Sequence, residues 1–298
     1  MEGKQFENKV IIITGASSGI GKACSFEFAG KGAKVVLAAR RIKELKIIEE
    51  KIKEQDGNAF SVKTDVKNIE DCKCLINKTI EKYGKIDVLI NNAGISMRAT
   101  FEDLDLSVIK ELMDTNFYGA VYCTKFALPH IIKQKGTVIG ISSIAGLAPL
   151  PGRTGYCASK HALNGFLNSL RMENIKKELN VLIVHPGFTE SSIRKNALNK
   201  MGVSQKESPR NEKEMMPAVK VAKSIAKAYI KGERSLVLTR QGKFAVWMYK
   251  IFPLIADLLI YNQMASELDY SDNSFSKVTN NKTNKIETIC ELSDINIL

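Results

Sequence analysis

The sequence predicts one α/β domain: a doubly wound parallel sheet with helices on both faces and a C-terminal helical extension. Short, continuous apolar runs recur along the chain, and such runs are typical of parallel strands that are buried on both faces. Segments with a helical period alternate with them, which implies right-handed crossover connections. The chain has 298 residues and is 44% hydrophobic, so it can bury one large core.

The apolar runs place the strands in order. We expect strands over residues 10–13, 34–39, 59–62, 88–91, 137–142 and 181–185. The first run ends in Thr-Gly, a helix is expected after Gly21, and residues 41–55 form a charged, periodic helix that ends before Gly57. In a sheet of this kind, a ligand binds at the carboxyl ends of the strands, where the strand order reverses.

A Gly-rich segment, Thr14-Gly15-Ala16-Ser17-Ser18-Gly19-Ile20-Gly21, follows the first expected strand and opens the first helix. Glycines at this position let the backbone approach a pyrophosphate at the positive end of the helix dipole. A glycine pattern alone is often only a tight turn. The strand before this one and the helix after it favour nucleotide binding.

Tyr156 and Lys160 are four residues apart in a segment that is expected to be helical. This spacing places the phenol and the ammonium on one helix face, where the cation favours the phenolate. A tyrosine in this position can act as an acid near neutral pH, protonating a carbonyl oxygen while a nicotinamide delivers hydride to the carbon.

These motifs, with others in a fixed order, resemble the short-chain dehydrogenase/reductase family. The resemblance covers about the first 240 residues and is to the NADP-preferring type with TGxxxGxG and YxxxK motifs. The other matching segments are Asn91-Asn92-Ala93-Gly94, Asn116, Ser143, and Pro186-Gly187 followed by Thr189. The resemblance implies a Rossmann-like fold and an oxidoreductase that interconverts a carbonyl and a secondary or primary alcohol.

The resemblance also implies four catalytic residues: Asn116, Ser143, Tyr156 and Lys160. Ser143 would hydrogen-bond the substrate oxygen, and Tyr156 would donate the proton in reduction. Lys160 would bind the nicotinamide ribose and lower the phenol pKa, and Asn116 would hold a water that continues a proton path. Ser143 alone could be a turn cap and Tyr156 alone a packed aromatic ring, but together the four residues favour catalysis.

The cofactor implied is NADP(H), because Ala39 stands where NAD-preferring members carry Asp, and Arg40 and Arg41 follow it. The cofactor-binding residues implied are Gly15, Ser17, Ser18, Gly19, Ile20, Gly21, Arg40, Arg41, Asp65, Val66, Asn92, Ala93, Gly94, Tyr156, Lys160, Pro186, Gly187 and Thr189. Asp65 either lines the adenine pocket or is a helix N-cap, and both interpretations stay open. Asn91 is expected to tie neighbouring strands together.

We expect residues 1–243 to form the dinucleotide-binding catalytic domain, 244–265 an apolar helical extension, and 266–298 a polar, poorly ordered tail. Residues 189–217 are expected to form a substrate lid, because they exceed the length of an ordinary connection. A plain surface connection is the alternative.

Residues 244–261 are apolar except for Lys250 and Asp257, and Pro253 is expected to split them into two helical pieces. They are too interrupted for a membrane span. Three interpretations stay open: a wall of the substrate pocket, a contact in a homodimer or homotetramer, and a peripheral membrane contact. The first two are favoured jointly.

Charge and cysteine usage narrow the class of protein. The net charge is +12, and Lys220, Lys223, Lys227 and Lys231 share one helix face, which a solvated surface explains better than an anionic partner does. No motif supports nucleic-acid binding.

Six cysteines without C-x-x-C spacing and three scattered histidines predict neither a metal site nor disulfides. The short polar segment before Val10 predicts no leader and a cytoplasmic location.

The leading hypothesis is an NADP(H)-dependent oxidoreductase that acts on an apolar small molecule, lipid-like, steroid-like or acyl-like. One alternative is a 3-oxoacyl reductase of fatty-acid metabolism. The other is a protein without turnover, a nucleotide-binding sensor or membrane-associated scaffold.

Overall fold

A seven-stranded, fully parallel sheet forms the centre of the molecule, in the order β3-β2-β1-β4-β5-β6-β7. The computed structural model describes residues 5–208, 211 and 214–267. The strands are β1 Val10–Thr14, β2 Lys34–Ala39, β3 Asn58–Lys63, β4 Val88–Asn91, β5 Thr137–Ile141, β6 Asn180–His185 and β7 Ser235–Val237.

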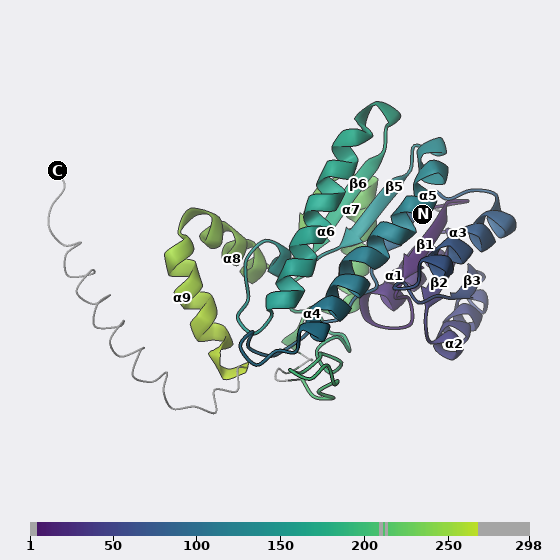
Figure 1. Cartoon of the computed structure of the whole chain (residues 1–298). Helices are drawn as coiled ribbons and strands as arrows, with labels where there is room; N and C mark the ends of the chain where they lie inside the picture. Colours follow the sequence, from purple (N-terminus) through teal and green to yellow (C-terminus); the bar gives the residue numbers. More distant parts are fainter. Residues whose placement is uncertain (1–4, 209–210, 212–213, 268–298) are drawn as a thin grey trace, which may run out of the picture.

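Helices cover both faces of this sheet (Figure 1). The helices are α1 Gly19–Gly30, α2 Ile42–Lys53, α3 Ile69–Tyr83, α4 Leu106–Met113, α5 Gly119–Lys133, α6 Thr154–Glu173, α7 Ala218–Ile230, α8 Arg240–Ile251 and α9 Pro253–Met264. Shorter turns are η1 Asp114–Tyr118, which is a π-helix, and the 3-10 turns η2 Ile144–Gly146, η3 Ile175–Lys177 and η5 Ala265–Glu267. The predicted fold class is confirmed.

Alternation along the strands builds two cores, one on each side of the sheet. In β1, Ile11 and Ile13 face the core beneath α1, α2 and α7, whereas Val10 and Ile12 face the core beneath α3, α5 and α6. All four side chains are completely buried. This two-sided burial is the reason that β1 has no polar alternation.

The first six strands lie where the apolar runs predict them, and their ends differ by at most one residue. The seventh, β7, was not expected. It has three residues, lies at the edge of the sheet and is only half-buried, so no apolar run marks it. The lysines of α7 project into solvent at Lys220, Lys223 and Lys227, opposite its buried face.

The C-terminal helices α8 and α9 stand beside the sheet rather than on it (Figure 1). We call residues 239–267 the C-terminal arch. Pro253 begins α9 directly after α8, so the expected split is confirmed. The arch exposes large apolar side chains at Phe244, Trp247, Ile251, Phe252, Leu254, Ile255, Leu258 and Leu259.

No helix in the described part of the chain is long and apolar enough to cross a bilayer. The expected polar tail lies outside the described residues except for its first two positions, which belong to η5.

Candidate active site

The carboxyl ends of four neighbouring strands bring the predicted segments together. Thr14 ends β1, Asn91 ends β4, Ile141 ends β5 and His185 ends β6, and these strands are adjacent and parallel. The Gly-rich loop, Asn92-Ala93-Gly94, Ser143 and Pro186-Gly187 therefore emerge at the same edge of the sheet. This edge is where a doubly wound sheet binds its ligand.

The Gly-rich loop packs tightly against the segment after β4. A Cβ atom at Gly21 would lie 2.5 Å from Asn92 Nδ2 and would also clash with the Gly15 carbonyl. Asn92 Nδ2 donates to the Thr14 carbonyl at 2.9 Å, and the backbone amides of Asn92 and Ala93 both donate to Thr14 Oγ1 at 3.0 Å. These bonds hold the loop backbone in place at the start of α1, where the amides of a helix N-terminus can bind an anion.

Arg41 is the arginine that reaches the Gly-rich loop. Its Nη2 donates to Ser17 Oγ at 2.8 Å and to Ser18 Oγ at 3.0 Å. Arg40 is exposed and has no such contact. Arg41 is the N-cap of α2, and its side chain makes no capping hydrogen bond. A cation at a helix N-terminus is unfavourable with respect to the helix dipole, and this one contacts the Gly-rich loop instead. This cluster of one cation and two hydroxyls suits a phosphate.

The structure excludes one of the two interpretations of Asp65. The N-cap of α3 is Asn68, which accepts from the Glu70 and Asp71 amides, so Asp65 is not the cap. Asp65 Oδ1 instead accepts the Lys67 amide at 3.1 Å, as in an Asx turn. Val66 is buried and packs against Gly119.

Asn91 does not tie two strands together. Its Nδ2 donates to Thr124 Oγ1 at 2.9 Å, which links β4 to helix α5. The reason is alternation: the Asn91 side chain points out of the sheet plane, toward the helix that covers this face.

Tyr156, Ser143 and Lys160 come together although they come from two elements. Ser143 follows β5, and its side chain acts on the Tyr156 phenol in the sense that lowers the phenol pKa. Lys160 Nζ lies 5.7 Å from the centroid of the Tyr156 ring and donates to the Ile141 carbonyl at 2.9 Å. The first turns of α6 therefore place a phenol and an ammonium near the hydroxyl that follows β5.

The expected lowering of the Tyr156 pKa by Lys160 is wrong for the protein as described. Burial raises the pKa of the phenol, and the hydrogen bond with Ser143 opposes this rise. Burial also lowers the pKa of Lys160 to about 8. The physical reason is that removing both groups from water penalises both charged forms, and the ammonium donates to a backbone carbonyl rather than to the phenol.

Asn116 lies in the π-helical turn η1 and is almost completely buried. Its Nδ2 donates to the Ile95 carbonyl at 3.0 Å and to Ser159 Oγ at 2.9 Å, and its Oδ1 accepts the Ile95 amide at 2.8 Å. Gly94 joins this residue to the cluster, because a Cβ atom there would lie 3.2 Å from Asn116 Oδ1 and 3.5 Å from Lys160 Nζ. Single turns of π-helix often mark functional sites.

The segment after β6 closes over the same edge. The Ile144 amide donates to the Pro186 carbonyl at 3.1 Å, and Thr189 is buried with its Oγ1 donating to the Gly187 carbonyl at 3.1 Å. The predicted lid returns beside this segment, since Thr189 forms a parallel bridge with Met216. Ser191 lies against the Gly-rich loop, because a Cβ atom added at Gly19 would be 3.2 Å from the Cβ atom of Ser191.

Three residues at the site were not predicted. Ser159 accepts from Asn116, and it was overlooked although it lies between Tyr156 and Lys160. Arg194 in the predicted lid donates to the Thr189 carbonyl at 2.5 Å, and nothing in this irregular basic segment of the sequence distinguishes it. Arg153 is buried three residues before Tyr156 and pairs with Glu267. A partner so distant in sequence leaves no local signal.

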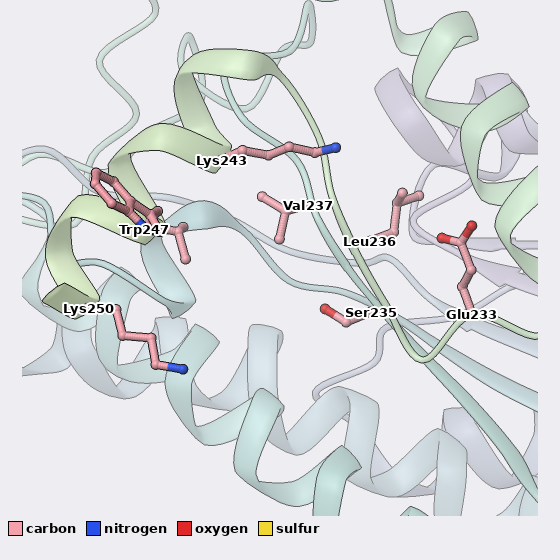
Figure 2. Close-up of a pocket in the computed structure, with 8 residues that line it drawn as sticks. Glu233, Ser235, Leu236, Val237, Lys243, Trp247 and Lys250 are labelled. Atoms are coloured by element: carbon pink, nitrogen blue, oxygen red, sulfur yellow. The ribbon is translucent and has the colours of Figure 1, made fainter.

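A separate hollow of about 380 Å³ lies between β7 and α8. Figure 2 shows Lys243 extending from α8 over Val237, with Trp247 at one side. None of the predicted catalytic residues lines it, so it is distinct from the candidate active site.

No group of three or more His, Cys, Asp or Glu side chains suited to a metal ion occurs among the residues that the structure describes. The cysteines within those residues are free thiols, with the Cys72 and Cys123 sulfurs 3.5 Å apart, and Cys290 lies outside them.

Comparisons with known proteins agree with this geometry. A family model described as short chain dehydrogenase matches residues 9–202. A relative from Dictyostelium discoideum, dehydrogenase/reductase SDR family protein 7-like, is 35% identical over 270 residues, covering 88% of this chain and 84% of that protein. From Arabidopsis thaliana, 11-beta-hydroxysteroid dehydrogenase-like 2 is 44% identical over 193 residues, covering 63% of this chain and 62% of that protein.

Solved structures share the fold. A short-chain dehydrogenase/reductase from Burkholderia phymatum in complex with NAD has a TM-score of 0.74 at 22% identity, covering 83% of this chain and 94% of that one. An alcohol dehydrogenase from the archaeon Thermococcus sibiricus, complexed with 5-hydroxy-NADP, has a TM-score of 0.69 at 23% identity, covering 77% and 95%. The chain therefore belongs to the short-chain dehydrogenase/reductase family, whose members are oxidoreductases that use NAD(P).

Proposed function

We propose that this protein is an NADP(H)-dependent oxidoreductase that interconverts a carbonyl and an alcohol on an apolar, steroid-like or lipid-like substrate. The observation that carries the proposal is the cluster of Tyr156, Ser143 and Lys160 at the carboxyl end of β5. A phenol beside a hydroxyl and an ammonium can give a proton to a substrate oxygen.

The residues at the sheet edge fit a nicotinamide dinucleotide, because Gly21, where a side chain would clash with the Gly15 carbonyl, lets the loop backbone turn closely into the start of α1. The amides of Gly19, Ile20 and Gly21 would hold the pyrophosphate, and Arg41 with Ser17 and Ser18 would hold the 2′-phosphate of NADP. Further contacts are assigned to Asp65, Val66, Asn92, Ala93, Gly94, Pro186, Gly187 and Thr189. When bound, the cofactor supplies the hydride.

The residues of the chain handle the proton. Tyr156 gives its proton to the substrate oxygen, and Ser143 holds that oxygen as negative charge develops on it. Burial raises the pKa of the phenol, which favours the protonated form that an acid in the reductive direction needs. Lys160 holds the nicotinamide ribose, and the proton is replaced along a path past Asn116, whose position beside Gly94 and Lys160 supports this role.

Two observations favour an apolar substrate. Several relatives carry the name 11-beta-hydroxysteroid dehydrogenase or a variant of it, with identities from 34% to 44%. The lid carries Met215 and Met216 on its inner, packed side, although Met201 is 66% exposed. Methionine adapts to irregular apolar shapes. A 3-oxoacyl reductase uses the same chemistry and is the alternative within the family.

The direct test is NADPH oxidation with a panel of steroid ketones, long-chain ketones, aldehydes and 3-oxoacyl thioesters, each repeated with NADH. We expect turnover with a steroid or long-chain ketone and a strong preference for NADPH. Turnover restricted to 3-oxoacyl thioesters selects the alternative substrate. Tight NADPH binding without turnover on any carbonyl would support the sensor or scaffold and contradict the enzyme.

The exposed arch supports a second role, a peripheral contact with an anionic membrane. Leu254 is 80% exposed, Trp247 is 52% exposed, and the cations Lys243 and Lys250 lie on the same helix as Trp247. Apolar and aromatic side chains beside lysines are the composition of interfacial helices. We expect co-sedimentation with vesicles that contain phosphatidylserine at low salt. Failure to sediment, together with a dimeric or tetrameric mass in solution, assigns this face to subunit contact instead.

A further inference from the structure

The C-terminal arch touches the candidate active site at both of its ends. At the first end, Ile144, the neighbour of Ser143, packs against Gly242 of α8 so closely that no Cβ atom would fit there. At the last end, Glu267 of η5 binds Arg153, which is the N-cap of α6 and lies three residues before Tyr156. Between its ends the arch exposes most of its apolar side chains. The two ends therefore hold the arch in place.

The Arg153–Glu267 ion pair is unlike the other ion pairs described. Arg153 Nη2 and Glu267 Oε2 are 2.7 Å apart, and the two side chains are only 9% and 5% exposed. The Lys135–Glu178 pair has the same separation, but its side chains are 68% and 61% exposed. A buried pair is costly to break on one side, because the remaining charge stays buried without a partner.

The first end of the arch is strained. Thr239 caps α8 by accepting the Gly242 amide at 3.0 Å, and its φ is 69°. A β-branched residue rarely adopts a positive φ, and such strain persists only where the surroundings enforce it. Thr239 also packs against Gly187, where a Cβ atom would lie 2.6 Å from Thr239 Oγ1. The chain thus turns sharply into the arch beside the segment that is assigned to the cofactor.

Charges near Arg153 are unbalanced without Glu267. Arg98 lies close enough to Arg153 to oppose its charge, and the partner of Arg98, Glu207, is 78% exposed. Burial raises the pKa of Tyr156, and the charges of Arg153 and Arg194 oppose this rise. Ser143 also lowers this pKa, and Cys157 raises it. Lys160 Nζ lies over the Tyr156 ring. Glu267 is therefore the buried anion that balances Arg153 beside the proposed acid.

We propose that Arg153 and Glu267 are a positioning pair that clasps the end of the C-terminal arch onto the start of α6. Because the clasp fixes the arch to the start of α6, three residues before Tyr156, it determines how tightly an apolar carbonyl substrate is held. This proposal rests on the proposed function and adds a substrate-determining role for two residues that touch neither cofactor nor reacting atoms.

The test compares Glu267→Gln, Arg153→Gln and the double variant with Glu178→Gln, the matched change in an exposed pair. For an apolar ketone that wild type reduces, Glu267→Gln and Arg153→Gln should each raise KM at least tenfold. kcat should change less than threefold, and NADPH affinity should be unchanged. The double variant should lie closer to wild type than either single variant, because it buries no lone charge. Glu178→Gln should behave as wild type.

Amide hydrogen exchange gives a readout that needs no substrate. In Glu267→Gln, exchange over residues 253–267 should accelerate at least tenfold, while exchange in β1 and β4 stays unchanged. KM within twofold of wild type, or unchanged exchange over 253–267, overturns the proposal. A parallel loss of kcat, NADPH affinity and protection throughout the sheet also overturns it, because the pair then only stabilises the fold.

Failure of the proposed function has a different signature. If wild type reduces no carbonyl, the enzyme proposal fails, and the clasp is judged by exchange and by binding of 1-anilinonaphthalene-8-sulfonate to the NADPH-loaded protein. Trp247 is the single tryptophan of the chain and lies in the arch, so its fluorescence reports this binding. A clasp requires weaker probe binding in Glu267→Gln than in Glu178→Gln; equal binding contradicts it.

Discussion

The sheet edge and the C-terminal arch are built in opposite ways. At the sheet edge, nearly every polar side chain has a partner within a few ångströms, as Thr14, Asn92 and Asn116 illustrate. The arch packs mainly on itself, and Ala256 and Met264 are among its few buried side chains. Under the proposed function, proton and hydride chemistry take place in a rigid frame, whereas the arch is held at a few points.

The largest effect we expect is the loss of turnover in Tyr156→Phe. Removing the hydroxyl removes the proposed acid, so kcat should fall by about 10³-fold or more, while NADPH affinity stays within about twofold. Steady-state kinetics and fluorescence titration measure the two quantities. If the variant keeps more than about a tenth of the wild-type kcat, the rigid edge is not the chemical centre.

The next largest effect tests which arginine at the sheet edge binds the 2′-phosphate of NADP. Arg41→Ala should raise KM for NADPH by about tenfold to a hundredfold, because it removes a charge-assisted phosphate contact, and it should leave KM for NADH unchanged. The matched variant is Arg40→Ala, which should change KM for NADPH less than about threefold, because Arg40 does not reach the loop. Equal losses with both cofactors would contradict the 2′-phosphate site.

A third prediction concerns the folding stability that the protein loses because Lys160 is buried. Burial lowers the pKa of Lys160 from 10.5 to about 8, so between these pH values the unfolded chain binds more protons than the folded one. The stability from this group is therefore lowest below pH 8 and rises as pH increases toward 10.5. Lys160→Met should abolish activity yet raise the free energy of unfolding at pH 7 by about 1–2 kcal/mol.

Thermal unfolding from pH 7 to pH 10.5 measures this gain, which should shrink as pH rises. Lys223→Met on the exposed face of α7 is the control and should give no pH-dependent gain. A Lys160→Met protein that is less stable than wild type at pH 7 would mean that the hydrogen bond to Ile141 outweighs the cost of burial.

The smallest effect tests the arch. Leu254→Ser should change the free energy of unfolding by less than about 0.5 kcal/mol, because the side chain is already 80% exposed. It should nevertheless weaken binding to anionic vesicles. Leu106→Ser, with 70% exposure on α4, is the matched control and should leave vesicle binding unchanged. If both variants bind vesicles equally well, the proposal that the arch contacts the membrane is wrong.

Much of the edge was predictable because its signals are local. The Gly-rich loop, Asn92-Ala93-Gly94 and the Tyr156/Lys160 spacing each lie on one element, and the parallel sheet brings the elements together. What failed was the direction of the Tyr156 pKa and the strand-to-strand role of Asn91. Both depend on burial and on nearby partners that a sequence pattern does not contain.

The sequence by itself determined the order of the strands along the chain, the phosphate loop and the helix that carries the proposed acid, because backbone periodicity and glycine geometry act over a few residues. Only the tertiary structure decided that Arg41 rather than Arg40 meets the loop, and that Glu267 closes onto Arg153. Contacts across such separations depend on how whole elements pack, and the chain carries no local mark of a partner that folding alone brings near.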